Sequence, residues 1–133
     1  MERNLSYYQQ NAAFRDALRG FLRTSEQVAR RNGLTPQRHL LLLMVKGAPD
    51  GSESATVGDL VKRLHLNQST VTELVSRSEA AGLLQRKRDQ EDRRVVHVSL
   101  TSKGDRQLRK VVKELEESRE QLRRALDEHV SLS

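Results

Sequence analysis

The sequence predicts a mainly α-helical single domain that carries one small β-hairpin. Apolar residues recur at helical spacing along most of the chain, and only residues 95–100 alternate apolar and polar side chains as a strand does. A length of 133 residues suits a single core. Hydrophobic residues are 35% of the chain and charged residues 32%, so that core is expected to be thin.

Long helices are expected at both ends of the domain, over residues 5–33 and 102–130. Phe14 and Phe21 mark the apolar side of the first, and the apolar residues of the last keep a near-heptad spacing. A helix of about 29 residues spans roughly 40 Å, more than the diameter of so small a domain, about 30 Å. We therefore expect both helices to form a dimerisation layer with a second copy of the chain. The alternative is that they pack only on each other within one chain.

Three shorter helices and a hairpin are expected in the central region, residues 34–101. Thr35-Pro36 provides an N-cap and a proline at the first helical position, and the following run Leu40–Val45 is apolar on every face. That helix therefore belongs in the centre of the core. Residues 48–55 contain turn formers and are expected to be a surface loop.

A tight pair of helices follows this loop. Thr56 and Asp59 form a variant capping box at the start of the first helix, and Asn67 is a good N-cap for the second, over about residues 68–81. The next segment, residues 84–88, is the expected partner of the alternating strand, with a charged tip between them. Two short helices followed by a basic hairpin are the order of elements in a winged helix-turn-helix.

Composition favours a polyanionic partner. The formal net charge is +6 and the isoelectric point is near 10.2, which indicates nucleic acid. Aromatic residues are only 3% of the chain, so a stacking platform for single strands is not expected. The absence of cysteine excludes disulfides, cysteine-ligated zinc and a thiol switch, and no segment resembles a signal peptide or a membrane span. We expect a soluble cytoplasmic protein with no membrane partner.

The second helix of the pair is the candidate recognition helix, because a major groove accepts one α-helix and polar side chains can bond base edges there. Its candidate DNA-binding residues are Gln68, Ser69, Thr70, Thr72, Glu73, Ser76 and Arg77. The hairpin is the candidate wing, whose cations can neutralise phosphates or enter a minor groove while a carboxylate orients them. Its candidate residues are Arg86, Lys87, Arg88, Asp92, Arg93 and Arg94. The alternatives are a merely solvated helix face and an exposed, ion-paired turn.

The ordered motifs of residues 57–108 resemble the MarR family of winged-helix transcription regulators. They are Asp59-Leu60-Val61-Lys62-Arg63-Leu64, Ser69-Thr70-Val71-Thr72, Ala81-Gly82-Leu83-Leu84, Asp92-Arg93-Arg94 and Leu100-Thr101-Ser102-Lys103-Gly104. The resemblance implies a homodimer that binds double-stranded DNA at a pseudo-palindromic operator, a repressor more often than an activator. One departure concerns the recognition helix, where Glu73 replaces an arginine that is common in the family.

The resemblance also implies a pocket for a small anionic or phenolic effector between the dimerisation layer and the winged helix. The residues that would line it are Phe14, Arg15, Leu18, Phe21, Arg38, His39 and Leu42. The alternative is that these are core and surface residues with no ligand. No metal motif joins the four histidines, and no phosphate loop or nucleophile motif is present, so neither a cofactor nor an enzyme is expected. The competing function is a dimeric winged-helix module that docks on another protein without specific DNA binding.

Overall fold

The computed structural model describes residues 2–131, and the burial of side chains over residues 6–127. In chain order the elements are α1 (Glu2–Arg31), α2 (Pro36–Lys46), β1 (Ser54–Ala55), α3 (Val57–Leu64), α4 (Gln68–Ala80), β2 (Leu84–Arg88), β3 (Val96–Leu100), α5 (Ser102–Glu114) and α6 (Glu116–Ser131). The predicted class, mainly helical with one small sheet, is confirmed.

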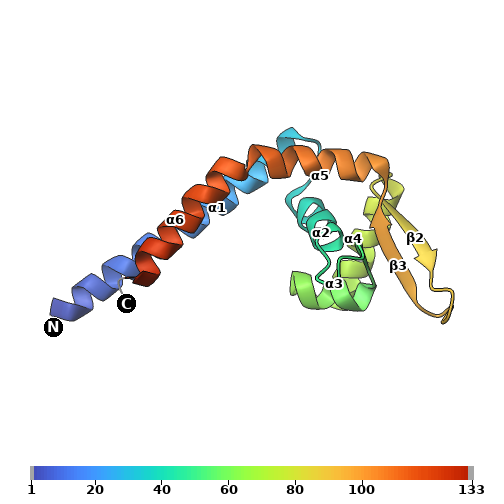
Figure 1. Cartoon of the computed structure of the whole chain (residues 1–133), viewed down its shortest axis with the longest axis horizontal. Helices are drawn as coiled ribbons and strands as arrows, with labels where there is room; N and C mark the ends of the chain where they lie inside the picture. Colours follow the sequence, from blue (N-terminus) through green and yellow to red (C-terminus); the bar gives the residue numbers. More distant parts are fainter. Residues whose placement is uncertain (1, 132–133) are drawn as a thin grey trace.

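Figure 1 shows a lobe with a projecting arm. α1 and α6 lie side by side along the arm, and α5 crosses the top of the lobe above α2. α3 and α4 lie on the other side of α2, and the β2–β3 hairpin forms the end of the lobe farthest from the arm. Within the described residues, no helix is long and apolar enough to cross a membrane.

The core is built around α2. Its residues Leu41, Leu42 and Val45 are fully buried, as predicted, but the prediction that the whole apolar run lies in the core was wrong for Leu40, which is 42% exposed. Every helix of the lobe contributes to the surrounding cluster, for example Leu60 from α3 and Val75 from α4. α1 contributes only through Val28 and Ala29, near its end, so most of the arm lies outside the core.

Side-chain caps fix where the helices of the lobe begin. The hydroxyl of Thr35 accepts from the backbone of α2, and Asn67 accepts from the N–H of Thr70 at 2.8 Å in α4. Thr56 and Asp59 form both bonds of the predicted capping box, 3.1 and 3.0 Å long. The donated Thr56 N–H lowers the pKa of the Asp59 carboxyl. These predicted helix starts are therefore confirmed.

The sheet has three strands in the order β1-β3-β2, all antiparallel to their neighbours. The predicted hairpin is present, with Leu84 opposite Leu100 and Arg88 opposite Val96. The interpretation of residues 48–55 as a loop alone was wrong, because Ser54 and Ala55 pair with β3. Ala55 is buried at 1% exposure, and two residues are too short for an alternating pattern to predict a strand.

The prediction of one helix over residues 102–130 was also wrong, because the chain bends between α5 and α6 at Leu115. The N–H of Leu115 is shared between the carbonyls of Val111 and Val112, and its side chain stays in the core at 6% exposure. The bend lets α5 pack on the lobe while α6 turns onto α1. No proline or glycine marks the position, so the sequence offers no breaker there.

The start of α5 lies very close to the start of β2. Thr101 donates through its hydroxyl to the carbonyl of Gly82 and through its N–H to that of Leu83, 3.0 Å away. Gly104 is buried against the same Leu83 carbonyl, and a Cβ added there would overlap that oxygen. The junction therefore requires glycine for space and not for backbone freedom.

Replacing this glycine should test the junction. Gly104→Ala is expected to lower the free energy of unfolding by about 3 kcal/mol, because the α5 backbone has to move away from Leu83. Gly58→Ala is the matched control, since an added Cβ there meets only Thr56 Oγ1 at 3.7 Å and alanine favours a helix by up to about 1 kcal/mol. Urea unfolding of both variants measures the difference. Equal stabilities would contradict the close approach.

His39 predicts a loss of stability in mild acid. The side chain is buried at 4% exposure, and burial lowers its pKa below the ordinary 6.5 because the imidazolium form loses its hydration. The unfolded chain then takes up a proton before the folded one, so this contribution is complete above about pH 6.5 and is lost as the pH falls below that value. Because one proton is involved, the free energy of unfolding changes by at most about 1.4 kcal/mol per pH unit.

The measurement is the free energy of unfolding between pH 7 and pH 5. His39→Gln should remove this part of the slope, whereas His65→Gln, at an exposed position, should retain it. A slope that survives unchanged in His39→Gln would assign the acid sensitivity to other groups.

Candidate nucleic-acid interface

A short turn sets the angle between α3 and α4. His65 ends α3 in the left-handed conformation, with φ of 56°, and Asn67 then starts α4. The Asn67 side chain accepts from Thr70 N–H and also from the hydroxyl of Ser69, 2.9 Å away. The Ser69 hydroxyl thus donates to the turn, and its oxygen can still accept a hydrogen bond.

α4 divides cleanly into a buried and an outward side. Val71, Val75 and Ser78 are fully buried, whereas most of the predicted readout residues are exposed and Thr70 is half-buried. The exposed ones are Gln68, Ser69, Thr72, Glu73, Ser76 and Arg77. The first turn of the helix, which is nearest to base edges in a helix-turn-helix, therefore presents uncharged polar groups.

Glu73 and Arg77 form an ion pair on this outward side. One turn separates them, and Arg77 Nη2 lies 2.6 Å from Glu73 Oε1 while both side chains stay more than half exposed. The acidic residue that departs from the family pattern therefore neutralises the cation of α4. Glu73 has to be displaced, or to find a base donor, before Arg77 can pair with a phosphate.

Arg86 connects the wing to the recognition helix. Its Nε donates to Glu79 of α4 at 2.8 Å, and its Nη2 donates to Ser76 at 3.3 Å. Arg86 and Ser76, both predicted to touch DNA, are thus engaged with each other and hold β2 against α4. The sequence did not predict the role of Glu79. Packing, and not the spacing of residues along the chain, decides which residues of α4 face β2.

The tip of the wing is held by its own side chains. Asp89 accepts from the N–H groups of Glu91 and Asp92, and Arg88 donates to the carbonyl of Arg93 at 2.8 Å. These bonds give residues 89–94 a defined path. The tip is therefore a turn held by its own hydrogen bonds.

Asp92 fixes the orientation of Arg94. Its carboxylate accepts from the Arg94 N–H and Nε at 3.1 Å and from Nη2 at 3.2 Å, and these bonds lower the pKa of Asp92. The Arg94 side chain nevertheless remains 90% exposed. Asp92 and Arg94 thus show the predicted pairing of a carboxylate with a wing arginine.

Two other wing cations lack such partners. Lys87 and Arg93 are exposed, and neither forms an ion pair or a side-chain hydrogen bond with the part of the chain that the structure describes. Together with Arg94 they give the wing its outward positive charge. Arg86 and Arg88, by contrast, serve the internal geometry of the wing.

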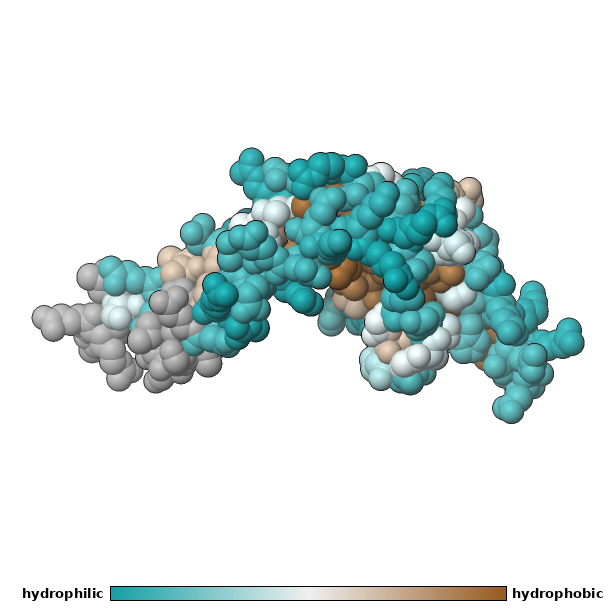
Figure 2. All heavy atoms as spheres, turned by 45° about the horizontal axis from the view of Figure 1, so that its top comes forward, coloured by the Kyte–Doolittle hydropathy of each residue, from teal (hydrophilic) through white to brown (hydrophobic). Residues whose placement is uncertain are grey.

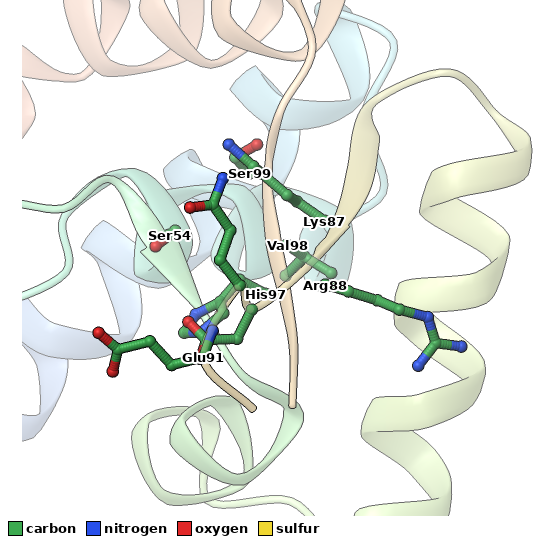
Figure 3. A pocket seen from close by; sticks show the side chains of 9 residues that line it. Ser54, Lys87, Arg88, Glu91, His97, Val98 and Ser99 are labelled. Carbon is green, nitrogen blue, oxygen red and sulfur yellow. The ribbon is translucent and has the colours of Figure 1, made fainter. Parts of the chain in front are cut away.

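A hollow of about 580 Å³ lies beside the wing, between β1 and the hairpin tip. Figure 3 shows Lys87, His97 and Ser99 around it, with the guanidinium of Arg88 pointing away. His97 Nε2 lies 3.8 Å from Asp89 Oδ1, so the histidine is placed beside the carboxylate that organises the tip. Among the described residues, no group of three or more acidic or histidine side chains could hold a metal ion.

Two of the seven residues predicted to form an effector pocket line cavities within the described part of the chain, and these are two different cavities. His39 and Leu42 are buried in the core, and Phe21 lines a groove between α1 and α6. Phe14, Arg15 and Leu18 precede Phe21 in α1. Arg38 lines a separate cavity of about 460 Å³ between the recognition helix and the start of α2, together with Arg30, Thr35, Pro36, Gln37, Thr70, Glu73, Leu74 and Arg77.

These elements define a class of protein. A capped helix pair with a tight turn, followed by a hairpin that packs against the second helix, is a winged helix-turn-helix. Residues 32–95 form such a domain of the MarR family, because they match the model of that family. The resemblance seen in the sequence is thus confirmed.

Known proteins support this assignment. The organic hydroperoxide resistance transcriptional regulator of Bacillus subtilis is 39% identical over 69 residues, which is 52% of this chain and 44% of the relative. The chain spans about half the length of the curated relatives that it matches.

Solved structures share the fold. A MarR family transcription regulator superposes with a TM-score of 0.73 at 22% identity, over 85% of this chain and 72% of the other. A mutant of MarR from E. coli, complexed with operator DNA, gives a TM-score of 0.68 at 17% identity, over 88% of this chain and 81% of the other.

Proposed function

We propose that this protein is a DNA-binding transcriptional regulator that acts as a homodimer on a pseudo-palindromic operator. The observation that carries the proposal is the pairing, on one lobe, of an outward polar α4 with a wing whose Arg94 is held in place yet 90% exposed. A relative of known structure was solved with operator DNA, and curated relatives are named transcriptional regulators, a class without catalytic activity.

Sequence readout is assigned to the first turns of α4. Gln68 can bond an adenine in bidentate fashion, and the hydroxyls of Ser69, Thr70 and Thr72 can contact bases or phosphates. Asn67 limits Ser69 to accepting, so a base with a donor suits that position. Arg77 supplies affinity once its pair with Glu73 opens.

The wing is assigned to the minor groove and the flanking phosphates. Because Asp92 already fixes Arg94, little side-chain entropy is lost when this arginine enters a narrow groove. Arg93 and Lys87 have to be ordered on binding, so we assign them to phosphates, where position matters less.

A homodimer explains the arm. Tyr7, Tyr8 and Leu22 are 61%, 67% and 48% exposed on α1, before the residues Val28 and Ala29 by which this helix joins the core. A partner arm packed there would cover these side chains and set two recognition helices at the spacing of two half-sites. Repression follows if the operator overlaps a promoter, because the bound dimer then blocks it.

The cavity between α4 and the start of α2 is the site we assign to a small anionic effector. Arg30, Arg38 and Arg77 line it with only one carboxylate, Glu73. An anion placed there competes with DNA for Arg77 and displaces α4, which gives release from the operator. Of the seven residues in the sequence-based pocket, Arg38 lines this cavity, and the larger pocket stays a prediction.

The test is selection of bound duplexes from a random library at about physiological salt, followed by sequencing. A pseudo-palindrome with half-site centres one helical turn apart, about 10 to 10.5 base pairs, or a multiple of it, is expected. Weak binding without an enriched sequence would favour the competing function, a winged-helix module that docks on another protein.

Variants of the two neighbouring wing arginines can distinguish the effect of a positioned side chain from the effect of its charge. Arg93→Ala and Arg94→Ala remove the same charge, and each should flatten the plot of log affinity against log salt by about one unit. Arg94→Ala should also cost about tenfold more affinity, because only Arg94 is held in advance by Asp92. Fluorescence anisotropy on the selected duplex measures both effects. Equal losses would contradict a special role for Arg94.

Glu73 should restrain binding. Glu73→Gln removes a negative charge beside the phosphates and frees Arg77, so affinity should rise and the salt plot should steepen by about one unit. The double variant Glu73→Gln with Arg77→Gln is the control and should lose the steeper slope. A fall in affinity for one particular base in the single variant would instead assign Glu73 to readout of a cytosine.

A further inference from the structure

A row of basic side chains follows the outer face of α5. Its members are Lys103, Arg106, Lys110 and Lys113, which we call the α5 row. At 3.6 residues per turn they fall within an arc of about 80°. All four are exposed, whereas the opposite side of the helix carries the buried Gly104, Leu108 and Val111.

Most of the charge of the α5 row is not neutralised within the molecule. Arg106, Lys110 and Lys113 form no ion pair with any carboxylate in the part of the chain that the structure describes. The two acidic residues of α5 are engaged elsewhere: Asp105 with Lys46 and Arg109, and Glu114 with Arg31. No carboxylate of α5 lies within the arc itself.

The α5 row lies on the other side of the lobe from the proposed readout surface. α2 separates α5 from α3 and α4 (Figure 1). Lys103 donates to the carbonyl of Ala81, 3.0 Å away at the end of α4, whereas readout is assigned to the beginning of that helix. Figure 2, with the top of Figure 1 turned forward, shows mainly hydrophilic residues over this part of the lobe. A duplex held by α4 and the wing therefore leaves the α5 row free.

We propose that the α5 row binds the phosphate backbone of a second DNA duplex, so that one regulator can hold two segments of DNA. The inference rests on the proposed function, since the first duplex is the one bound by α4 and the wing. Arg106 and Lys113 are about 10 Å apart along the helix axis, a length over which a duplex presents several phosphates.

The chemistry of the α5 row favours DNA over an acidic protein. Protein interfaces depend on aromatic or aliphatic anchors at their centre, and the arc contains only lysine and arginine. Non-specific DNA binding needs no such anchor, because it is driven by neutralised phosphates and released counterions. The expected contact is weak, independent of sequence and lost at high salt.

A capture experiment tests the proposal. The selected duplex is immobilised and loaded with protein, free protein is washed away, and a fluorescent duplex of unrelated sequence is added at about 50 mM salt. The wild type should retain the second duplex. The triple variant Arg106→Gln, Lys110→Gln, Lys113→Gln should retain at least about tenfold less, with its affinity for the immobilised duplex changed less than about threefold. Lys103 is left unchanged because it also contacts Ala81.

The matched control keeps the charge: Arg106→Lys, Lys110→Arg, Lys113→Arg should capture as the wild type does. Absence of capture by the wild type, or equal capture by the glutamine variant, would overturn the inference while leaving the first duplex bound. Failure of the proposed function is distinguishable, because the first duplex would then not be selected by sequence at all. Loss of capture in the charge-retaining variant would also count against a purely electrostatic contact.

Discussion

The structure of the lobe depends on the removal of one apolar helix, α2, from water. α2 has apolar side chains on all its faces, so a single packing partner cannot remove it from water, and α1, α3, α4, α5, β1 and β3 all pack against it. Each of these elements buries a few residues on α2 and turns its remaining face outward. The readout face of α4 and the basic face of α5 are therefore consequences of the same packing, on opposite sides of one buried helix.

The thin core explains why the arm exists as a separate feature. Only the last turns of α1 reach α2, and α6 leaves the lobe at Leu115, so the two helices beyond that point cover each other but little else. A monomer of this shape keeps apolar and aromatic side chains of α1 in water. The arm therefore leaves apolar surface uncovered, which the proposed homodimer would bury.

Local signals made most of the lobe predictable. Caps such as Asn67 and the box of Thr56 with Asp59 act within three residues, so the sequence alone indicates where these helices begin. The alternation around Val98 likewise predicted β3. What could not be predicted depends on contacts distant in sequence. β1 is a strand only because β3 lies beside it, and the bend at Leu115 follows from two packing partners and not from a breaking residue.

In the candidate interface too, some features could be predicted from local sequence and others depend on distant contacts. Exposure and charge of its residues followed from periodicity, but their roles did not, because an arginine that reads DNA and one that braces the fold look alike in a sequence. The register of the hairpin against α4 commits Arg86 to Glu79, and the path of the tip commits Arg88 to a backbone carbonyl. Net charge therefore overstates the charge available to a polyanion.

Internal ion pairs also bear on the proposed binding of DNA. The pair of Glu73 with Arg77 is exposed on both sides, and such pairs stabilise a fold by only about 0 to 1 kcal/mol. Opening it therefore costs little in stability, and its main effect is a carboxylate kept next to any bound phosphate. Asp92 does the opposite for Arg94, since it accepts several hydrogen bonds and still leaves the guanidinium exposed. If the proposed function holds, Glu73 would oppose charge-driven binding while Asp92 would direct it, and this combination would lower affinity for DNA in general more than affinity for a site that fits the wing.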